Sequence, residues 1–303
     1  MRILITGGAG FVGSHLCDKY IQDGYDVVCL DTGNFLNVSH LIEREHFIPC
    51  YDDILDPVYI NTLVGSGDFD AIIHLAAQVR VDKAIVNPVF TWNINVNGTL
   101  NLLDAARKND VKKFLFASSS EVYGSAQYAP INEEHPLGST SIYGASKIAG
   151  DRLCHAYAVT YGMNIGILRP FNIYGPRQTA GVISLFINKI LKNSSPMIQG
   201  DGSQSRDYIY IDDIVSAYNC MLYAKSSNVI NFGTGVETTV KKLAETIINI
   251  CKKDIKPEYH DAPLNTTMSL VADISQANSL GWKPKYDLEH GIMKFITWCK
   301  ERE

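Results

Sequence analysis

Short apolar runs alternate with amphipathic stretches over the first two thirds of the chain. The runs, each about as long as a buried strand, cover residues 2–6, 26–30, 46–50, 70–75, 112–117 and 163–168. Stretches in which apolar residues recur with helical spacing cover residues 11–23, 88–108 and 143–161. Strands that alternate with helices form a parallel sheet covered by helices on both faces, so we predict an α/β fold with a doubly wound sheet.

The pattern is less regular after Arg169. Residues 180–193, 238–253 and 286–303 have helical spacing, whereas 205–210 and 228–232 have the composition of short strands. We therefore predict two domains. Residues 1–170 form the larger domain, to which about residues 207–235 return, and residues 171–206 and 236–303 form a smaller mixed α/β lobe.

A glycine-rich turn links the first predicted strand to the first predicted helix, with glycines at positions 7, 10 and 13. Gly7 allows a sharp turn, Gly10 lets the backbone approach a pyrophosphate, and Gly13 lets the helix pack closely on the strand. The N–H groups of such a turn and the helix N-terminus bind an anion. The second strand ends at Asp31, whose carboxylate accepts hydrogen bonds from a ribose diol and repels a 2′-phosphate. We therefore predict a Rossmann-type site for NAD in preference to NADP.

Composition excludes several classes of protein. The chain has 303 residues, 46% of them hydrophobic, a formal net charge of -5 and no run of like charges, which argues against binding to nucleic acid or anionic lipid. No apolar stretch approaches the length of a membrane span. The seven cysteines lack metal-ligand spacing and no signal peptide precedes the first strand, so we expect reduced thiols, no metal site and a cytoplasmic protein.

The groups needed for hydride transfer from an alcohol follow two of the predicted elements. Tyr143 and Lys147 lie on one face of a helix, and the strand that ends at Ala117 leads into Ser119 and Glu121. When hydride leaves a carbinol carbon, the hydroxyl proton must leave too, and a tyrosine with a pKa of about 10 is a weak base at neutral pH. The lysine and a positive nicotinamide ring would lower that pKa. We predict Tyr143 as the base, Ser119 as a hydrogen-bond donor to the substrate oxygen and Glu121 as an auxiliary acid or base.

These residues resemble the motifs of the extended short-chain dehydrogenases/reductases, in particular the nucleotide-sugar epimerase/dehydratase family that includes UDP-glucose 4-epimerase. The resemblance covers nearly the whole chain. Its motifs are residues 6–13, Asp53-Ile54, 74–77, 95–99, Tyr143 with Lys147, 169–176 and 200–208.

The resemblance implies a set of binding residues and a place in polysaccharide biosynthesis. The residues implied for NAD, besides Gly7, Gly10, Gly13, Asp31, Tyr143 and Lys147, are Phe11, Val12, Asn34, Asp53, Ile54, Leu75, Ala76, Ala77, Asn95 and Phe171. Those implied for a UDP-, dTDP-, CDP- or GDP-linked sugar are Ser119, Ser120, Asn172 and Arg206, of which the last two would hold the diphosphate. It also implies a homodimer formed through helices 88–108 and 143–161.

The motifs identify the family more specifically than they identify the reaction. Members that oxidise C4 of a hexose with NAD then diverge into 4-epimerases, 4,6-dehydratases, UDP-glucuronate decarboxylases and C4 oxidases. Ser120-Glu121 resembles the dehydratases and decarboxylases, whereas Met268 stands near the place of an arginine common in relatives, which weakens the decarboxylase interpretation. We predict 4-epimerisation. A non-catalytic NAD(H)-binding regulatory protein is the alternative of another class, although such a protein is expected to lose Tyr143 or Lys147.

Overall fold

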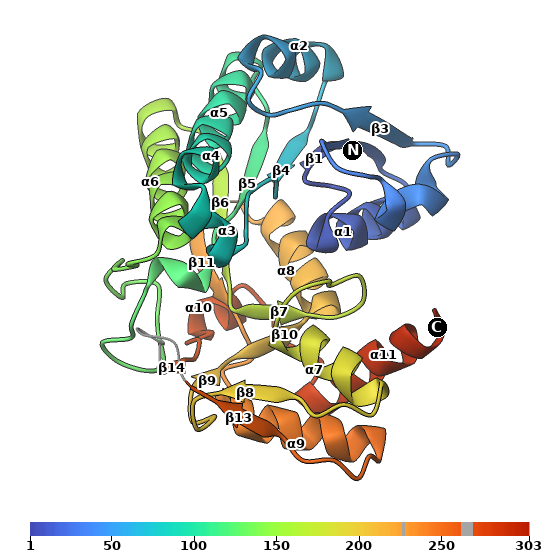
Figure 1. Cartoon of the computed structure of the whole chain (residues 1–303). Helices are drawn as coiled ribbons and strands as arrows, with labels where there is room; N and C mark the ends of the chain where they lie inside the picture. The colour runs from blue at the N-terminus through green and yellow to red at the C-terminus, as the bar shows by residue number, and fades with distance from the viewer. Residues whose placement is uncertain (226–227, 262–268, 303) are drawn as a thin grey trace. The chain divides into compact units, whose positions relative to one another are not determined.

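The computed structural model describes residues 1–225, 228–261 and 269–302 (Figure 1). The chain forms two compact units. The first comprises Met1–Gly124, Pro136–Arg169 and Val215–Ile230, and the second comprises Ser125–His135, Pro170–Ile214 and Asn231–Glu303. The predicted boundaries differ from these units in two places: Ser125–His135 lies in the second unit, and the segment that returns to the first unit is Val215–Ile230 instead of about 207–235.

The first unit is built on a parallel sheet of seven strands, so the predicted doubly wound α/β fold is confirmed. The order is β11-β6-β5-β4-β1-β2-β3. The strands are β1 (Arg2–Thr6), β2 (Asp26–Asp31), β3 (Phe47–Tyr51), β4 (Ala71–His74), β5 (Lys113–Ala117), β6 (Ile165–Pro170) and β11 (Asn228–Phe232). Because the direction of winding reverses between β1 and β4, the carboxyl ends of these strands are where an open α/β sheet binds ligands.

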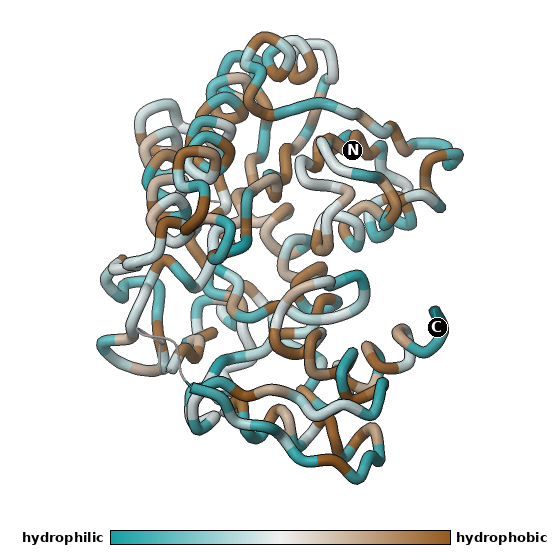
Figure 2. The backbone as a smooth tube through the Cα atoms, viewed as in Figure 1, coloured by the Kyte–Doolittle hydropathy of each residue, from teal (hydrophilic) through white to brown (hydrophobic). Residues whose placement is uncertain are grey.

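Helices cover both faces of this sheet (Figure 1). They are α1 (Phe11–Gln22), α2 (Pro57–Gly67), α3 (Val81–Val86), α4 (Pro88–Trp92), α5 (Thr99–Lys108), α6 (Ile142–Tyr161) and α8 (Ile211–Tyr223), with shorter turns η1 (Leu36–Leu41) and η3 (Ser120–Val122). Leu102 of α5 and Cys154 of α6 pack with Leu4 and Phe114 of the sheet in one buried cluster. Figure 2 shows the hydrophobic strands enclosed by these helices. The burial of this apolar surface stabilises the unit.

The predicted helix over 88–108 is interrupted. A π-helix, η2 (Asn93–Gly98), separates α4 from α5. The wider turn of a π-helix changes which side chains face inward, and Asn95, buried within it, bonds to partners outside the helix. Helices α2 and α8 were not predicted from the sequence pattern.

In its described residues, the second unit contains small sheets and helices. Strands β7 (Asn172–Tyr174) and β10 (Tyr208–Tyr210) pair in parallel, as do β8 (Met197–Gln199) and β13 (Glu258–His260), and β9 (Ser205–Arg206) lies between β12 (Thr238–Thr239) and β14 (Ser269–Leu270). The helices are α7 (Val182–Leu191), α9 (Val240–Cys251), α10 (Ser275–Ser279) and α11 (Leu288–Lys300).

The single strand predicted over 205–210 is therefore wrong, because the segment divides between two sheets at Asp207. The Asp207 side chain is fully buried, and its carboxylate accepts hydrogen bonds from the N–H groups of Thr234 and Gly235, both at 2.8 Å. This carboxylate ties the segment between the two strands to a distant loop, an arrangement that alternation of apolar residues does not reveal.

Candidate active site

The glycine turn after β1 is tightly packed. Gly7 has a left-handed φ of 69°, and its N–H donates to the Leu30 carbonyl at 2.8 Å. A Cβ on Gly7 would lie 2.7 Å from the Ala76 nitrogen, and one on Gly13 would lie 2.2 Å from the Gly7 carbonyl oxygen. Only glycine fits at these two positions. Helix α1 starts after Gly10 without a side-chain cap, so the first-turn N–H groups are available to a ligand anion.

The Asp31 carboxylate lies beside this turn. One oxygen accepts from the Ala9 N–H at 3.1 Å, and the other accepts from the Gly33 N–H at 2.8 Å. Asn37, which the sequence did not single out, donates to the Ala9 carbonyl at 3.0 Å and so holds the turn from its other side. Asn34 is exposed in the loop between Gly33 and η1. Two oxygens fixed in this way leave lone pairs for the diol of a ribose.

Apart from Asn95 in the π-helix, the remaining residues implied for NAD in the first unit lie in three places. The Asp53 carboxylate accepts from the Leu55 N–H at 3.0 Å, whereas Ile54 is 4% exposed and belongs to the core. Leu75 and Ala76 follow β4, and their N–H groups donate to the carbonyl and hydroxyl oxygens of Thr6 at 3.0 and 3.3 Å. The half-buried residues Phe11, Val12 and Ala77 lie at the start of α1 and after β4, with Val12 beside the buried Gly13.

These features fit an adenine dinucleotide. The structure brings the glycine turn, the uncapped start of α1 and the Ala76 backbone into contact, and it places the Asp31 carboxylate next to them. A pyrophosphate requires the bare backbone that the glycines provide, and a ribose diol requires the carboxylate. Phe171, which the resemblance also implies for NAD, belongs to the second unit and is 3% exposed.

Ser119, Glu121 and Tyr143 come together in the first unit. The Ser119 side chain and the Glu121 charge both act on the Tyr143 phenol. A Cβ on Gly144 would lie 2.7 Å from the Glu121 carbonyl oxygen, so this glycine lets α6 approach the turn that carries the glutamate. Burial raises the pKa of Tyr143 to about 12, with Glu121 acting in the same direction and Ser119 opposing it. Ser120 is buried in η3.

Lys147 is 3% exposed, one turn beyond Tyr143 on α6. Its Nζ donates to the Ala117 carbonyl at 2.8 Å and lies 5.9 Å from the Tyr143 ring centroid. Burial lowers the pKa of Lys147 to about 8. Because burial dominates at Tyr143 as well, the structure holds that residue as a neutral phenol. The lowering of its pKa by the lysine together with a nicotinamide ring stays a prediction.

A buried ion pair next to Lys147 was missed from the sequence. Asp151, one helical turn after the lysine, raises the pKa of Lys147 against the effect of burial. The Asp151 carboxylate accepts two bonds from the Arg169 guanidinium, at 2.6 and 2.8 Å, and both side chains are almost fully buried. Burial still raises the pKa of Asp151. The spacing of Lys147 and Asp151 on one helical face was the available signal.

Asn172 and Arg206, implied for the substrate, belong to the second unit. Asn172 is paired with Tyr208 in the register of β7 with β10. Arg206 lies two residues before Tyr208, and Asp207 separates them. Arg206 is half-buried, and its Nη1 donates to the Ser205 carbonyl at 2.7 Å. Met268 lies outside the described residues.

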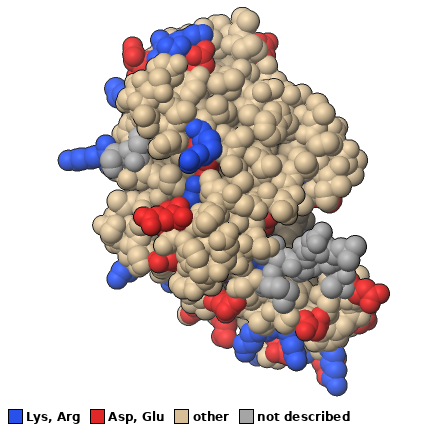
Figure 3. Space-filling view, turned by 90° about the vertical axis from the view of Figure 1, so that its left-hand side faces the viewer, with Lys and Arg blue, Asp and Glu red and all other residues tan. Residues whose placement is uncertain are grey.

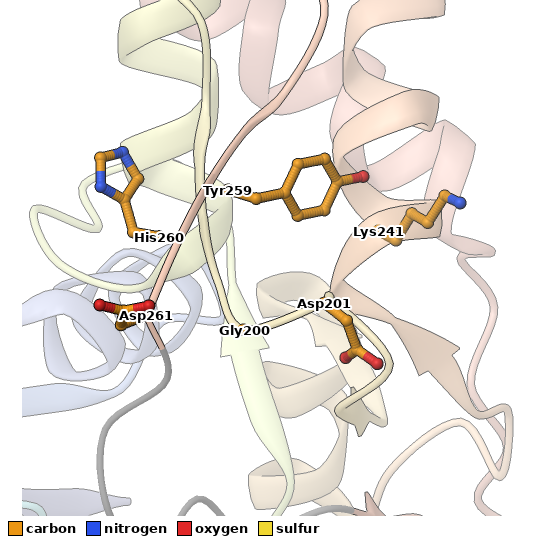
Figure 4. A pocket seen from close by; sticks show the side chains of 6 residues that line it. All are labelled: Gly200, Asp201, Lys241, Tyr259, His260 and Asp261. Atoms are coloured by element: carbon orange, nitrogen blue, oxygen red, sulfur yellow. The ribbon is translucent and has the colours of Figure 1, made fainter.

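The second unit also carries an open pocket of about 770 Å³ (Figure 4). Most of its side chains are exposed to solvent, and none of the predicted site residues lines it. The lining residues are Gly200, Asp201, Lys241, Tyr259, His260 and Asp261. Asp201 is already engaged with Ser203, whose N–H and hydroxyl donate to its carboxylate at 2.9 and 2.6 Å.

Among residues 1–225, 228–261 and 269–302, no group of three or more His, Cys, Asp or Glu side chains is arranged to hold a metal ion. In the same parts of the chain, no helix has the length and apolar character needed to cross a membrane.

Comparison with known proteins identifies the family. Residues 4–295 match the family described as GDP-mannose 4,6 dehydratase. A Methanocaldococcus jannaschii protein, named provisionally as a UDP-glucose 4-epimerase, is 41% identical over 98% of each chain. UDP-glucose 4-epimerase of Mycolicibacterium smegmatis is 35% identical over 100% of this chain and 99% of its own. UDP-glucuronic acid decarboxylase 1 of Danio rerio is 34% identical over 98% of this chain and 72% of its own.

Solved structures agree with these relatives. UDP-glucose 4-epimerase of Thermotoga maritima, solved with UDP-glucose, has a TM-score of 0.95 and 32% identity over 100% of this chain and 99% of that one. A UDP-glucuronic acid 4-epimerase mutant of Bacillus cereus, solved with NAD and a fluorinated UDP-glucuronic acid, has a TM-score of 0.93 and 30% identity over 100% of both chains. The chain therefore belongs to the nucleotide-sugar epimerase/dehydratase family of extended short-chain dehydrogenases/reductases, whose members are NAD-dependent epimerases, dehydratases and decarboxylases.

Proposed function

We propose that the protein is a nucleotide-sugar 4-epimerase that acts through a 4-keto sugar. The observation that carries the proposal is that the Ser119 side chain acts on the Tyr143 phenol, on a helix that also buries the ammonium of Lys147. This arrangement removes and returns the proton of an alcohol. Epimerisation requires no further acid or base, and the relatives named as 4-epimerases align over nearly their whole length.

The chain's own residues move the proton at C4. NAD, held by the glycine turn and Asp31, supplies the hydride acceptor and, for the return, the hydride donor. Tyr143 Oη takes the proton of the C4 hydroxyl during oxidation and gives it back during reduction. Ser119 donates a hydrogen bond to the same substrate oxygen and keeps it oriented. The charge of Lys147 favours the phenolate form of Tyr143, which burial alone disfavours.

We assign Asn172 and Arg206 to the diphosphate of the substrate. A guanidinium binds phosphate oxygens through a pair of directed hydrogen bonds. The peptide N–H of Asp207 donates to Leu270, and its carboxylate is held by the 234–235 loop, so the residue next to Arg206 is rigid. The guanidinium therefore extends from a fixed backbone.

The second candidate is a 4,6-dehydratase, favoured by the position of Glu121. Its half-buried carboxylate acts on the Tyr143 phenol, so it lies close to the reacting end of the site. Elimination of water from a 4-keto sugar requires a base for the C5 proton, a role that a carboxylate at this place can take. Relatives named as dTDP-D-glucose 4,6-dehydratase are 31% identical.

We further propose a homodimer formed through the helices of residues 88–108 and 143–161. Val89, Phe90 and Trp92 of α4 are 68%, 49% and 45% exposed, and Val159 and Tyr161 of α6 are 72% and 52% exposed. In Figure 3, the face that carries these helices has few charged side chains across a broad area. Apolar groups of this size that gather on one face are typical of a protein interface.

We also propose a cytoplasmic location. The seven cysteines are free thiols, and three of them, Cys17, Cys29 and Cys154, are buried in the first unit. Free cysteines in this number are typical of a reducing compartment.

Product analysis tests the reaction. The purified protein is incubated with NAD and UDP-, dTDP-, CDP- or GDP-linked sugars, including UDP-glucuronate, and the products are separated and weighed by mass spectrometry. A new isomer of unchanged mass is the expected result and identifies the nucleotide. Loss of water, carbon dioxide or two hydrogens would instead establish a dehydratase, a decarboxylase or an oxidase.

Substitution of the base tests the mechanism. We expect Tyr143→Phe to lower kcat by at least about 1000-fold while NAD still binds, because the ring remains and only the proton acceptor is lost. Tyr128→Phe is the matched control, since Tyr128 is exposed and its hydroxyl donates to Asn132 at 2.9 Å in the second unit. Ordinary turnover by Tyr143→Phe would overturn the assignment of the base.

A further inference from the structure

His74 is a buried histidine that the proposed reaction does not use. It ends β4, is 1% exposed and is bonded on both sides of its ring. Nδ1 lies 2.8 Å from the Thr6 hydroxyl, and Nε2 lies 2.9 Å from the Thr99 hydroxyl. Thr6 and Thr99 are fully buried, so the three side chains form a polar connection through the interior of the first unit.

The partners of these hydroxyls determine where each proton lies. The Thr99 hydroxyl donates to the Asn95 carbonyl at 2.6 Å, which uses its single proton. It must therefore accept from Nε2–H of His74. Nδ1 then has no proton and accepts from the Thr6 hydroxyl, which itself accepts from the Ala76 N–H at 3.3 Å. Each of the three side chains, His74, Thr6 and Thr99, therefore has a hydrogen-bond partner of the opposite kind. The imidazole is neutral, with its proton on Nε2.

One end of this connection reaches the catalytic helix. Asn95 lies in the π-helix, and its side-chain amide donates to the Ser146 hydroxyl at 2.9 Å. Ser146 lies between Tyr143 and Lys147 on α6, and its hydroxyl donates to the Tyr143 carbonyl at 2.7 Å. The position of Asn95 is therefore transmitted to the backbone of the proposed base.

The other end reaches the segment that lines the cofactor site. The Thr6 hydroxyl accepts a hydrogen bond from the Ala76 N–H. The side-chain amide of Asn95 makes two hydrogen bonds to the Gln78 backbone: its nitrogen donates to the carbonyl at 3.0 Å, and its oxygen accepts from the N–H at 2.7 Å. Residues 76–78 are thus bonded both to the strand side and to the π-helix side of the connection. A displacement of Asn95 would move this segment and α6 together.

We propose that His74 is a positioning residue, which holds the π-helix through Thr99 and thereby fixes the first turn of α6. Asn95 and Ser146 complete the link to Tyr143 and Lys147. The inference rests on the proposed function, because it gives α6 the catalytic tyrosine. A neutral ring suits this place, since a second positive charge would repel the buried Lys147. Burial keeps the ring neutral by lowering the pKa of His74 to about 3.

The test uses Thr99→Val and Thr99→Ser. Valine has the shape of threonine but cannot accept from His74 or donate to Asn95, whereas serine can do both. The matched control is Thr91→Val, because Thr91 is also fully buried. Its hydroxyl donates to the Asn87 carbonyl at 3.1 Å, four residues earlier in the chain, just as the Thr99 hydroxyl donates to the carbonyl of Asn95. Thr91 has no bond to a histidine in the structure as described.

We expect Thr99→Val to lower kcat by about 10-fold to 100-fold with KM changed less than about 2-fold, since a small displacement of catalytic groups costs this much. Thr99→Ser should recover kcat to within about 3-fold of the original protein. Thr91→Val should shift the melting temperature as Thr99→Val does but leave kcat unchanged. Equal loss of kcat in the Val and Ser variants, or full kcat in Thr99→Val, would overturn the inference.

Hydrogen exchange of the free protein supplies a readout that needs no turnover. Amides of residues 141–147 should exchange faster in Thr99→Val than in Thr91→Val, and His74 should show the Nε2–H tautomer by nitrogen NMR. If the original protein converts no sugar nucleotide, the proposed function fails while these two measurements still decide the inference. Unchanged exchange, or a proton on Nδ1, would contradict it.

Discussion

At the scale of single residues, the site holds two groups whose charged forms burial disfavours. Burial raises the pKa of Tyr143 to about 12 and lowers that of Lys147 to about 8. The phenol resists losing its proton, and the ammonium resists keeping its charge. A site of this kind sacrifices stability for chemistry, because the charge of Lys147 is useful only when a reacting group is present.

Replacement of Lys147 measures how much stability its buried charge costs. Lys147→Met should abolish turnover and stabilise the fold by roughly 3 kcal/mol at pH 7, as estimated from the pKa difference between 10.5 and about 8. Below pH 8 the lysine is protonated in both states, so the cost of the buried charge is complete. Between pH 8 and 10.5 the unfolded chain binds more protons, so the advantage of the variant shrinks as pH rises. Urea unfolding at several pH values measures it.

Lys113→Met is the matched control for activity. Burial also lowers the pKa of Lys113 to about 8, but its Nζ donates to Asn164 and to the Ala224 carbonyl, at 2.9 and 2.8 Å. This variant should keep ordinary turnover. Loss of activity in both variants would indicate a general effect of buried lysines on the unit, and an advantage of Lys147→Met that does not change with pH would contradict the assigned cost.

At the scale of elements, the glycine turn and α1 act as one rigid part. Gly13→Ala should weaken NAD binding by at least about 10-fold, because its Cβ would lie 2.2 Å from the Gly7 carbonyl oxygen and force the helix away from β1. Gly138→Ala is the control, since the nearest atom to its Cβ would be the Tyr123 carbonyl oxygen at 3.6 Å. Calorimetric titration with NAD measures both. Equal affinities in the two variants would show that the close packing is unnecessary.

The sequence predicted the elements whose signal is local. The strands from β1 to β6 and helices α1 and α6 follow from apolar periodicity, and the glycine turn follows from residue type. The interruption of the helix over 88–108 could not be predicted, because Asn95 bonds to Gln78 and Ser146, which are distant in the sequence. The division at Asp207 has the same cause. Where a buried polar group is hydrogen-bonded to a residue distant in the sequence, the periodicity of apolar residues does not predict the local structure.

The candidate site shows the same limit. Tyr143 and Lys147 are separated by one helical turn and were predicted as a pair, and the structure brings Ser119 to them. Arg169, the partner of Asp151, comes from β6 and was not predicted. Residue spacing within an element reveals a site, whereas the ion pairs that support it require the fold.

At the scale of the whole molecule, the first unit exposes large apolar side chains on α4 and α6, which together are called the exposed apolar face. The side chains of α4 and α6 that form it come from helices that also carry the machinery of the site, since α6 holds Tyr143 and α4 leads into the π-helix. A partner on this face would therefore restrain both helices from outside, as the bonds of Asn95 and Ser146 do from inside. Association and catalysis are linked if the face forms a dimer.

Phe90→Asp tests the face. Phe90 is 49% exposed, and a carboxylate there would be buried without a partner in a dimer, so we expect the particle mass to fall from twice the 33.6 kDa of one chain to that of one chain. Leu185→Asp is the matched control, because Leu185 is 57% exposed but belongs to α7 of the second unit, and this variant should stay dimeric. Sedimentation at several concentrations measures the mass. A single-chain mass for the original protein, or a dimer that survives Phe90→Asp, would show that this face is not the interface and that α6 is held in place by its internal bonds alone.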